Sequence, residues 1–322
     1  MQAGIEESKA RIYGILVTYR RPAALEAMLG HLACQDIKLE CLLLVDNGPC
    51  VSNEAAAQKF MDSGNSVSYM PLTQNLGPAG AISHGLRRVL GMGRDDDWVV
   101  LLDDDDPPRD NKLIGSLFTF GRQMYEEDPL TAGVGVGGAR FDRKRGRLLR
   151  LEDTELEAPA VPVDCIGGNL FPLYRVGAVR SVGLFNEELF FGYEELEFGL
   201  RLRGAGYSLY TNGPLRMASR VRAHRAGIDV KPRIRLGNPS WRDYYGLRNL
   251  VFLLRKAGLT STAIRITVIA GVVKPLLNIP MAPKRSLKHL ILKLRACRDG
   301  WMSRMGRTID PPLDQLKPVR RR

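Results

Sequence analysis

The stretch WVVLLDDDDPP, residues 98–108, decides the architecture that the sequence predicts. Its apolar first half is typical of a strand buried on both faces of a parallel sheet. Four aspartates, Asp103 to Asp106, follow directly in a chain of formal net charge +12. Crowded carboxylates repel one another unless a cation lies among them, and their oxygens suit Mg²⁺ or Mn²⁺. Alternate residues of an extended chain point the same way, so Asp103 and Asp105 are expected to share one ion. A solvated acidic turn is the alternative.

Three apolar segments of the same kind precede this stretch, and helical segments separate them. Strands are expected at residues 11–19, 41–46, 67–72 and 98–103, and helices at 22–34, 53–61 and 79–91. This alternation predicts a mainly parallel α/β sheet with helices on both faces. Ligands bind at the carboxyl ends of the strands in such sheets, and Asp46 and Asp103 are expected at that edge.

The rest of the chain is expected to be less regular. Strands are predicted at residues 132–141, 146–152 and 165–174, and helices at 194–206, 244–258 and 261–277. The last helix is apolar, but Arg265, Lys274 and Pro275 interrupt it, which makes it a poor membrane span.

Composition places the chain among soluble globular proteins, with 44% hydrophobic and 25% charged residues over 322 positions. Five scattered cysteines and an N-terminus without an apolar segment favour a cytosolic location. Positive charge is concentrated at residues 281–322, which hold four Lys and eight Arg against three Asp. Such a segment suggests an anionic partner, namely membrane lipid, nucleic acid or a phosphorylated substrate, although the last few residues read equally as a solvated tail.

Residues 284–307 within this segment predict a basic amphipathic helix. Its apolar residues are Leu287, Leu290, Ile291, Leu294, Met302 and Met305. Two interpretations stay open, a helix lying on an anionic membrane and a helix packed on the rest of the protein with a solvated basic face.

A second acidic cluster lies in LFNEELFFGYEELEFGLRLRGAGY, residues 184–207. Glu194, Glu195 and Glu197 fall at the start of a predicted helix, where acidic side chains complement the helix dipole. The surrounding aromatic residues would desolvate a carboxylate and raise its pKa, while the helix terminus would lower it. A carboxylate in this setting is a reasonable general base for a hydroxyl group.

Five motifs, taken in order, resemble those of family 2 glycosyltransferases. They are ILVTYRRP, LLLVDNG, NLGPAGA, LLDDDDPP and FFGYEELEFGLRLRGAGY, and the resemblance runs from about Ile12 to Gly258. It implies the GT-A fold, which is a Rossmann-like, mainly parallel central sheet flanked by helices. It also implies a nucleotide-diphosphate sugar donor, a divalent metal and transfer with inversion. A catalytic domain is then expected at residues 1–258, divided near residue 110 into a nucleotide-sugar half (about 1–110) and an acceptor half (about 111–258). A basic helical C-terminal extension at 259–322 follows.

The resemblance also implies roles for individual residues of this chain. Asp103 and Asp105 match the metal-binding Asp-x-Asp pattern, and His224 in RVRAHRAG matches a third metal ligand, with a purely structural histidine as the alternative. The carboxylate pair of Glu194 and Glu195 is catalytic, and Glu195 is the base. The donor-binding positions are Thr18, Asp46, Asn75, Gly77 and Asp104.

Other features of the motifs bear on the substrates. The stretches EFGLRL and WRDYYGLRNL look closest to galactofuranosyltransferases and rhamnosyltransferases, which favours UDP-galactofuranose or dTDP-rhamnose as donor. Arg20 stands where the family usually has Asn, DNGPCV replaces DNGSTD, and Glu195 is longer than the usual Asp, so the donor stays open. The acceptor is expected to be a glycan, a lipid-linked glycan or a small molecule. The enzyme would then be cytoplasmic or peripheral on the inner face of the membrane.

Two other classes compete with this interpretation. A nucleic-acid-binding protein would fit the isoelectric point of about 9.6, but the charge is in the tail while the expected ligand edge is acidic. A sugar nucleotidyltransferase would also be α/β and metal-dependent. It would need a glycine-rich basic loop after the first strand, where this chain has YRRPAAL.

Overall fold

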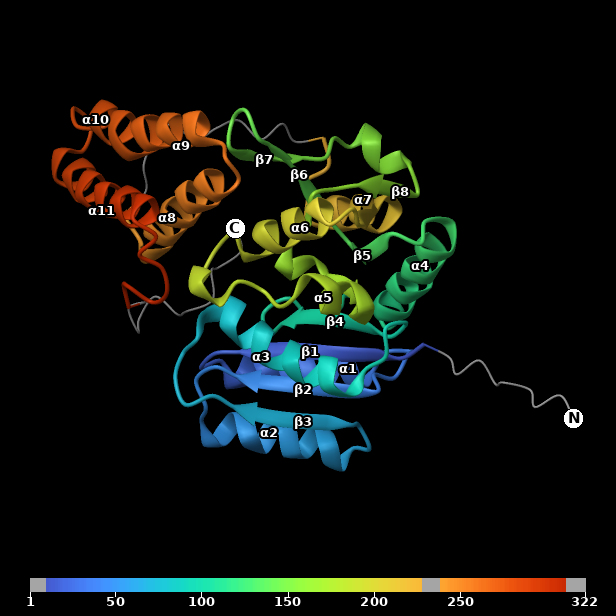
Figure 1. Cartoon of the computed structure of the whole chain (residues 1–322). Helices are drawn as coiled ribbons and strands as arrows, with labels where there is room; N and C mark the ends of the chain where they lie inside the picture. Colours follow the sequence, from blue (N-terminus) through green and yellow to red (C-terminus); the bar gives the residue numbers. More distant parts are fainter. Residues whose placement is uncertain (1–9, 228–237, 311–322) are drawn as a thin grey trace, which may run out of the picture.

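The computed structural model describes residues 10–227 and 238–310, and its centre is one large sheet of eight strands (Figure 1). The strand order is β3-β2-β1-β4-β10-β5-β11-β8. The parallel part consists of β1 (Ile12–Thr18), β2 (Cys41–Asp46), β3 (Val67–Pro71) and β4 (Trp98–Asp103). Beyond β4 the directions are mixed, with β10 (Leu173–Arg175), β5 (Thr131–Gly135), β11 (Ser208–Asn212) and β8 (Ala160–Pro162). The mainly parallel sheet predicted from the apolar runs is therefore confirmed.

The parallel strands are apolar throughout because helices cover both faces of the sheet. Alternate residues point into opposite layers, so Leu16 and Leu102 pack on one side while Ile15 and Leu101 pack on the other. The first layer contains α1 (Pro22–Ala33), α2 (Val51–Asp62) and α4 (Leu113–Glu127). The second contains α3 (Gly77–Met92), α5 (Val176–Val182) and α6 (Glu194–Gly204).

A smaller sheet replaces part of the expected strand pattern. It is formed by β6 (Gly138–Asp142), β7 (Arg147–Arg150) and β9 (Cys165–Ile166), in the order β7-β6-β9. The prediction of one strand at 165–174 was wrong, because β9 ends early and a 3₁₀ turn, η2 (Gly168–Leu170), precedes β10. Phe171 then has a left-handed backbone with φ of 52°, which redirects the chain from the small sheet to the large one. The apolar run continues through this bend because its residues are buried on both sides of it.

The C-terminal part is helical and lies to one side of the large sheet (Figure 1). Its helices are α7 (Gly213–Arg222), α8 (Trp241–Lys256), α9 (Thr260–Ile266), the π-helical η4 (Thr267–Val273), α10 (Lys274–Leu277) and α11 (Pro283–Trp301). Ser240 and Asp243 form a capping box that fixes the start of α8. Where the chain divides into domains stays a prediction, and the last basic residues, 311–322, lie outside the described part.

One stretch of the described chain, Thr260–Leu277, is long and apolar enough to cross a membrane by length and composition. By these two criteria it qualifies, contrary to the expectation drawn from its charges. Only 22% of it is buried inside the protein.

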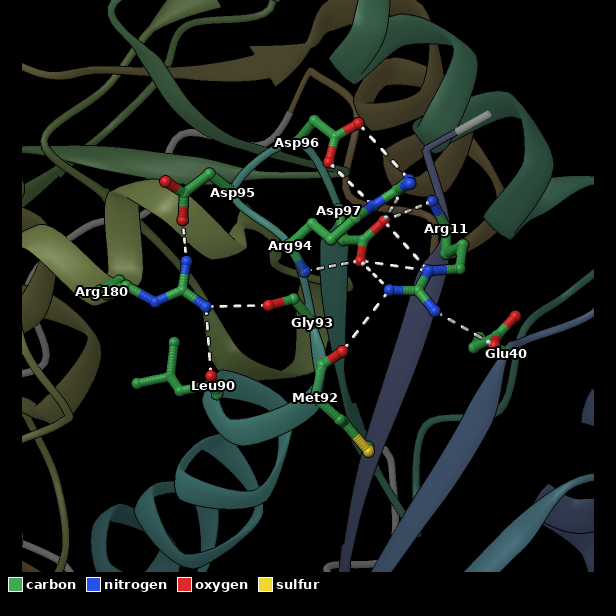
Figure 2. A network of polar contacts seen from close by, with 10 residues as sticks. All are labelled: Arg11, Glu40, Leu90, Met92, Gly93, Arg94, Asp95, Asp96, Asp97 and Arg180. Atoms are coloured by element: carbon green, nitrogen blue, oxygen red, sulfur yellow. Dashed lines mark hydrogen bonds and ion pairs between the residues drawn. The ribbon is translucent and has the colours of Figure 1, made fainter. Parts of the chain in front are cut away.

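A buried aspartate locks the amino ends of β1 and β4 together, at the edge of the sheet opposite to the expected site (Figure 2). Asp97 accepts hydrogen bonds from the Arg11 backbone (2.9 Å), the Arg11 guanidinium (2.8 Å) and the Arg94 backbone (2.8 Å). Burial opposes its ionisation, but these hydrogen bonds outweigh it and hold the pKa of Asp97 below its usual value. The clamp sets the register in which both strands reach the opposite edge.

Candidate active site

Three adjacent parallel strands bring their polar ends to one edge of the sheet. Thr18 at the end of β1 is in register with Asp46 of β2, and Val17 is in register with Asp103 of β4. The expectation that Asp46 and Asp103 lie at this edge is confirmed. Because the strands are parallel, their carboxyl ends form the crevice in which α/β sheets bind ligands.

The aspartate run forms a cluster in the turn after β4, with Asp104 buried and Asp103 and Asp105 exposed. Asp103, Asp104 and Asp105 each offer an oxygen, and these oxygens lie within 4.8 Å of one another. Asp104 is buried and accepts hydrogen bonds from Thr18 Oγ1 (2.8 Å) and Arg21 Nη1 (3.0 Å). The same Arg21 nitrogen donates to Asp105 at 2.8 Å. Thr18 and Arg21 therefore compensate part of the crowded negative charge.

The negative charge at Asp103 is compensated less completely. Desolvation, followed by the charges of Asp105 and Asp104, raises the pKa of Asp103 to about 7, although its side chain keeps access to solvent. Desolvation also raises the pKa of Asp104, against the opposing hydrogen bond from Thr18 and the charge of Arg21. The oxygens that remain are hard ligands at the spacing that a divalent ion needs, so the cluster fits Mg²⁺ or Mn²⁺.

A cavity of about 300 Å³ opens over this cluster. Of the predicted residues it is lined by Thr18, Asn75, Gly77, Asp103, Asp104 and Asp105. It is also lined by residues that the sequence analysis did not single out, including Arg21, Asn47, Phe190, Phe191, Trp241 and Arg242. A larger hollow of about 1120 Å³ lies along α4 and the start of α7, but it contains neither the aspartates nor the glutamate pair. The smaller cavity is therefore the candidate site.

The turn before α3 forms one wall of the cavity. Asn47 donates through Nδ2 to Asn75 Oδ1 (2.9 Å) and accepts from the Leu76 backbone at Oδ1 (2.8 Å). Asn75 Oδ1 also accepts from the backbone of Gly77 (2.8 Å), which begins the helix. Gly77 has φ of 71°, and a Cβ there would lie 2.0 Å from the Phe190 carbonyl oxygen, so only glycine fits. The start of a helix at the cavity suits an anionic ligand.

Asp46 is placed differently from the other donor-binding candidates. It is fully buried and does not line the cavity. Its carboxylate accepts hydrogen bonds from the Gly48 backbone (3.1 Å), Asn53 Nδ2 (2.8 Å) and Tyr69 Oη (2.8 Å). The neighbouring Asn47 lines the cavity instead, and a direct contact between Asp46 and a nucleotide stays a prediction.

The glutamate pair begins α6, directly after a strained turn. Phe190, Gly192 and Tyr193 all have positive φ, and they place Glu194 and Glu195 at the helix N-terminus. Neither glutamate lines the cavity, but Phe190 and Phe191 of the same turn do. Glu197, the third acidic residue, is bound to Arg201 at 2.9 Å and has a structural role.

The two glutamates differ in their surroundings. Glu195 Oε1 accepts the Gly168 backbone N–H at 3.2 Å, whereas Glu194 Oε2 is buried without a partner among the described residues. Burial raises the pKa of both carboxyls, and the charges of Glu195 and Asp103 raise that of Glu194 further. Glu195 thus accepts a hydrogen bond that favours its ionised form, and the two carboxyls titrate as a coupled pair.

Helix α8 holds the strained turn in place. Asn249 Nδ2 donates to three backbone carbonyls of the turn, those of Leu189 (3.0 Å), Phe191 (3.0 Å) and Gly192 (2.7 Å). The buried Arg248 donates to the Leu189 carbonyl (2.9 Å). Trp241 at the start of α8 packs against Phe191 with ring centroids 4.5 Å apart. The motif WRDYYGLRNL does not reveal in the sequence that α8 holds the turn in place, because the contacts join residues about sixty positions apart.

His224 lies away from any described contact with the aspartates. It follows α7 as an exposed residue with φ of 51°, and the three-carboxylate cluster does not include it. Its role as a metal ligand stays a prediction.

Comparison with known proteins gives a family for the first part of the chain. Residues 15–124 match the family model described as Glycosyl transferase family 2. A protein named galactofuranosyltransferase GlfT1 of Mycobacterium tuberculosis is 26% identical over 207 residues, covering 61% of this chain and 65% of that protein. The match thus spans less than two thirds of the length of that relative. The N-acetylglucosaminyl-diphospho-decaprenol L-rhamnosyltransferase of the same organism is 25% identical over 245 residues, covering 67% and 77%.

A solved structure supports the fold. The crystal structure of GalNAc-T7 with UDP, GalNAc and Mn²⁺ superposes with a TM-score of 0.54 at 12% identity, covering 78% of this chain and 48% of that chain. This likeness concerns the fold alone. The GT-A fold and the family resemblance predicted from the motifs are both confirmed.

Proposed function

We propose that this chain, whose residues 15–124 match the family 2 glycosyltransferase model, moves a sugar from a nucleotide-diphosphate donor to an acceptor hydroxyl with inversion. One observation carries the proposal: the cavity that contains the three-aspartate cluster is also lined by the turn that leads into the glutamate pair, of which Glu194 is buried and Glu195 half-buried. The chemistry of group transfer needs both parts, one for the leaving group and one for the acceptor.

Asp103 and Asp105 are the proposed metal ligands, with His224 as the proposed third. A divalent ion bound there would offset the negative charge that builds on the departing diphosphate. Asp104 is tied to Thr18 and Arg21, so its part in donor binding is to order this side of the cavity. Thr18, Asn75 and Gly77 line the cavity where the rest of the donor would lie, and the start of α3 favours its negative charge.

Glu195 is the proposed general base. It takes the proton from the acceptor hydroxyl as that oxygen attacks the anomeric carbon, and the bond to the diphosphate breaks on the opposite side. Inversion follows from this single displacement. The Gly168 backbone donor supports the assignment, because it favours the anionic form of Glu195, whereas Glu194 Oε2 has no partner among the described residues.

The names of the relatives support a narrower donor class. UDP-galactofuranose and dTDP-rhamnose are the favoured donors, because one relative is named as a galactofuranosyltransferase and the other as a rhamnosyltransferase. The acceptor class is a glycan, a lipid-linked glycan or a small molecule. A lipid-linked acceptor would place the enzyme in the cytoplasm at the inner face of the membrane.

A panel of nucleotide sugars tests the proposal against its competitors. The full chain is incubated with each donor and Mn²⁺ or Mg²⁺, and the released product is identified. A glycosyltransferase releases nucleoside diphosphate, through transfer or slow donor hydrolysis, and chelation of the metal stops the release. Pyrophosphate production from sugar phosphate and nucleoside triphosphate would instead support a sugar nucleotidyltransferase. The proposal fails if no donor is turned over or bound while the protein binds nucleic acid.

A further inference from the structure

The C-terminal helices expose an unusual amount of apolar surface. Among the described residues, eleven of the eighteen large apolar side chains that are exposed lie between positions 264 and 294. They are Ile264, Val268, Ile269, Val273, Leu276, Leu277, Ile279, Met281, Leu287, Ile291 and Leu294. Scattered exposed apolar residues need no explanation, but these residues lie on helices that pack on one another, and exposed apolar residues gathered in this way mark a candidate binding surface.

The buried residues of Thr260–Leu277, the stretch formed by α9, η4 and α10, are small or polar apart from Pro275, and the half-buried Ile266 also packs inward. Thr262, Ala263 and Gly271 are buried, and a Cβ at Gly271 would lie 2.9 Å from Cys297 Sγ of α11. The outward face carries Ile264, Val268 and other members of the apolar set. The helical stretch is therefore packed on the protein along its less apolar side.

Helix α11 likewise exposes apolar residues and buries polar ones. Its buried residues are Ser286, His289, Lys293, Ala296, Cys297, Asp299 and Gly300. Leu290 and Leu292 are half-buried, whereas Leu287, Ile291 and Leu294 are exposed at one-helix-face spacing. A helix that simply completes a soluble domain buries its leucines and exposes its lysines. Packing on the catalytic domain, one of the two interpretations of this helix, therefore does not explain where its apolar residues lie.

The positive charge around the exposed apolar residues favours an anionic partner. Residues 244–298 contain no Asp or Glu, and Lys274, Lys284 and Lys288 are exposed beside the apolar residues. A second copy of the chain would bring like charges face to face across a two-fold interface. A spanning arrangement would pull Thr260–Leu277 off the helices on which it packs and would carry Arg265 and Lys274 into hydrocarbon. An anionic bilayer surface accepts both the apolar side chains and the lysines.

We propose that the outward faces of α9, η4, α10 and α11 dock the protein on an anionic lipid bilayer, with these helices lying in the plane of the membrane surface. We call this set of outward residues the docking face. Figure 1 shows α9, α10 and α11 together at the outer edge of the molecule, beside α8. Because Trp241 and Arg242 of α8 line the cavity, the same helix connects the docking face to the candidate site. If the proposed function holds, this arrangement would present the site to an acceptor held in the bilayer.

Flotation with lipid vesicles tests the proposal without any donor or acceptor, so it is independent of the glycosyltransferase assignment. The full chain is mixed at low salt with phosphatidylcholine vesicles, either alone or with about 30% phosphatidylglycerol. We expect flotation with the anionic vesicles, weaker flotation with the neutral ones, and release of the protein as salt is raised, because salt screens the lysines.

Two sets of variants identify the surface. Leu277→Ser, Leu287→Ser and Ile291→Ser together remove side chains that are 66%, 55% and 62% exposed, so folding should be retained while vesicle affinity falls at least about tenfold. Changing Lys274, Lys284 and Lys288 to Gln should lower affinity for the anionic vesicles on the order of 100-fold. The matched control is Val51→Ser with Met61→Ser on α2, which also removes exposed apolar side chains but should leave flotation unchanged.

Three results would overturn the proposal. The first is a wild-type chain that stays with the soluble fraction at low salt. The second is flotation that the docking-face variants do not change. The third is a concentration-dependent dimer, seen by light scattering, that the triple serine variant abolishes, because the face would then be a contact between two copies of the chain.

Discussion

The glutamate pair allows a test that separates a base from its neighbour. Glu195→Gln keeps the size of the side chain and the hydrogen bond from the Gly168 backbone, but it can no longer accept the proton of an acceptor hydroxyl. A positioned base contributes about 10²–10⁴ in rate, so kcat should fall by that factor, or about 2.7–5.4 kcal/mol in barrier height. Donor affinity should change little, because neither glutamate lines the cavity.

The effect on pH dependence and stability follows from the raised pKa of Glu195. Activity of the wild type should fall as pH drops through this raised pKa, since the base becomes protonated. Stability has the opposite dependence: a buried carboxyl with a raised pKa contributes fully below its unfolded pKa, and this contribution is lost as pH rises through the folded value. Glu195→Gln removes the buried charge, so its melting temperature relative to the wild type should increase from acid to neutral pH.

The assays are single-turnover transfer for kcat, calorimetric titration of nucleotide for affinity, and thermal unfolding at several pH values. Glu194→Gln is the comparison, because Glu194 is not the proposed base and a neutral amide there should cost less activity than it does at Glu195. Glu197→Gln controls for loss of a carboxylate on the same helix, since it is bound to Arg201. If Glu194→Gln lost more activity than Glu195→Gln, the assignment of the base would be reversed, and near-full turnover by Glu195→Gln would refute it.

Four further variants test other parts of the structure. Asp105→Ala should weaken nucleotide binding relative to the wild type in the presence of Mn²⁺, and it should leave binding in the presence of chelator unchanged. If the variant bound nucleotide as tightly as the wild type in Mn²⁺, Asp105 would have no role as a metal ligand. Gly77→Ala should destabilise the chain by at least about 1–2 kcal/mol in thermal unfolding, because of its left-handed backbone and the close Phe190 carbonyl. Asn249→Ala should lower kcat about 10- to 100-fold with nucleotide affinity little changed, because the turn before the base loses three hydrogen bonds. Asp97→Ala should cost about 3 kcal/mol in urea unfolding, because it leaves the Arg11 side chain and two backbone N–H groups without their partner.

The parallel half of the fold was predictable because the apolar composition of its strands shows that both of their faces are buried. Residues of β1, β2 and β4 are buried on both faces, so an apolar run alone identifies each strand and the polar residue at its end. Asp46 and Asp103 could therefore be assigned to the same edge before any contact was known. The run at 165–174 was misassigned because Gly167, Gly168 and Asn169 interrupt its apolar residues and the chain bends at Phe171 between two sheets.

Sequence patterns did not predict the contacts between segments that are distant along the chain. Asn249 and Arg248 read as ordinary polar positions of a helix, and only the packing of α8 on the turn at Leu189 reveals what they bind. The inward-facing polar side of α11 was equally hidden. An amphipathic pattern indicates two faces, but it does not say which of them meets the protein.

The acidic run itself shows how a folded chain tolerates four like charges before any ligand binds. Arg21, which begins the first helix, donates one nitrogen to both Asp104 and Asp105, and Thr18 satisfies the buried oxygen of Asp104. Among the described residues no side chain donates comparably to Asp103, and desolvation together with the charges of Asp105 and Asp104 raises its pKa to about 7. The protein thus supplies enough positive charge to fold the loop but not enough to neutralise it. A cation that binds here gains the uncompensated part of the repulsion as binding energy, which is why the residual charge lies at the cavity and not in the core.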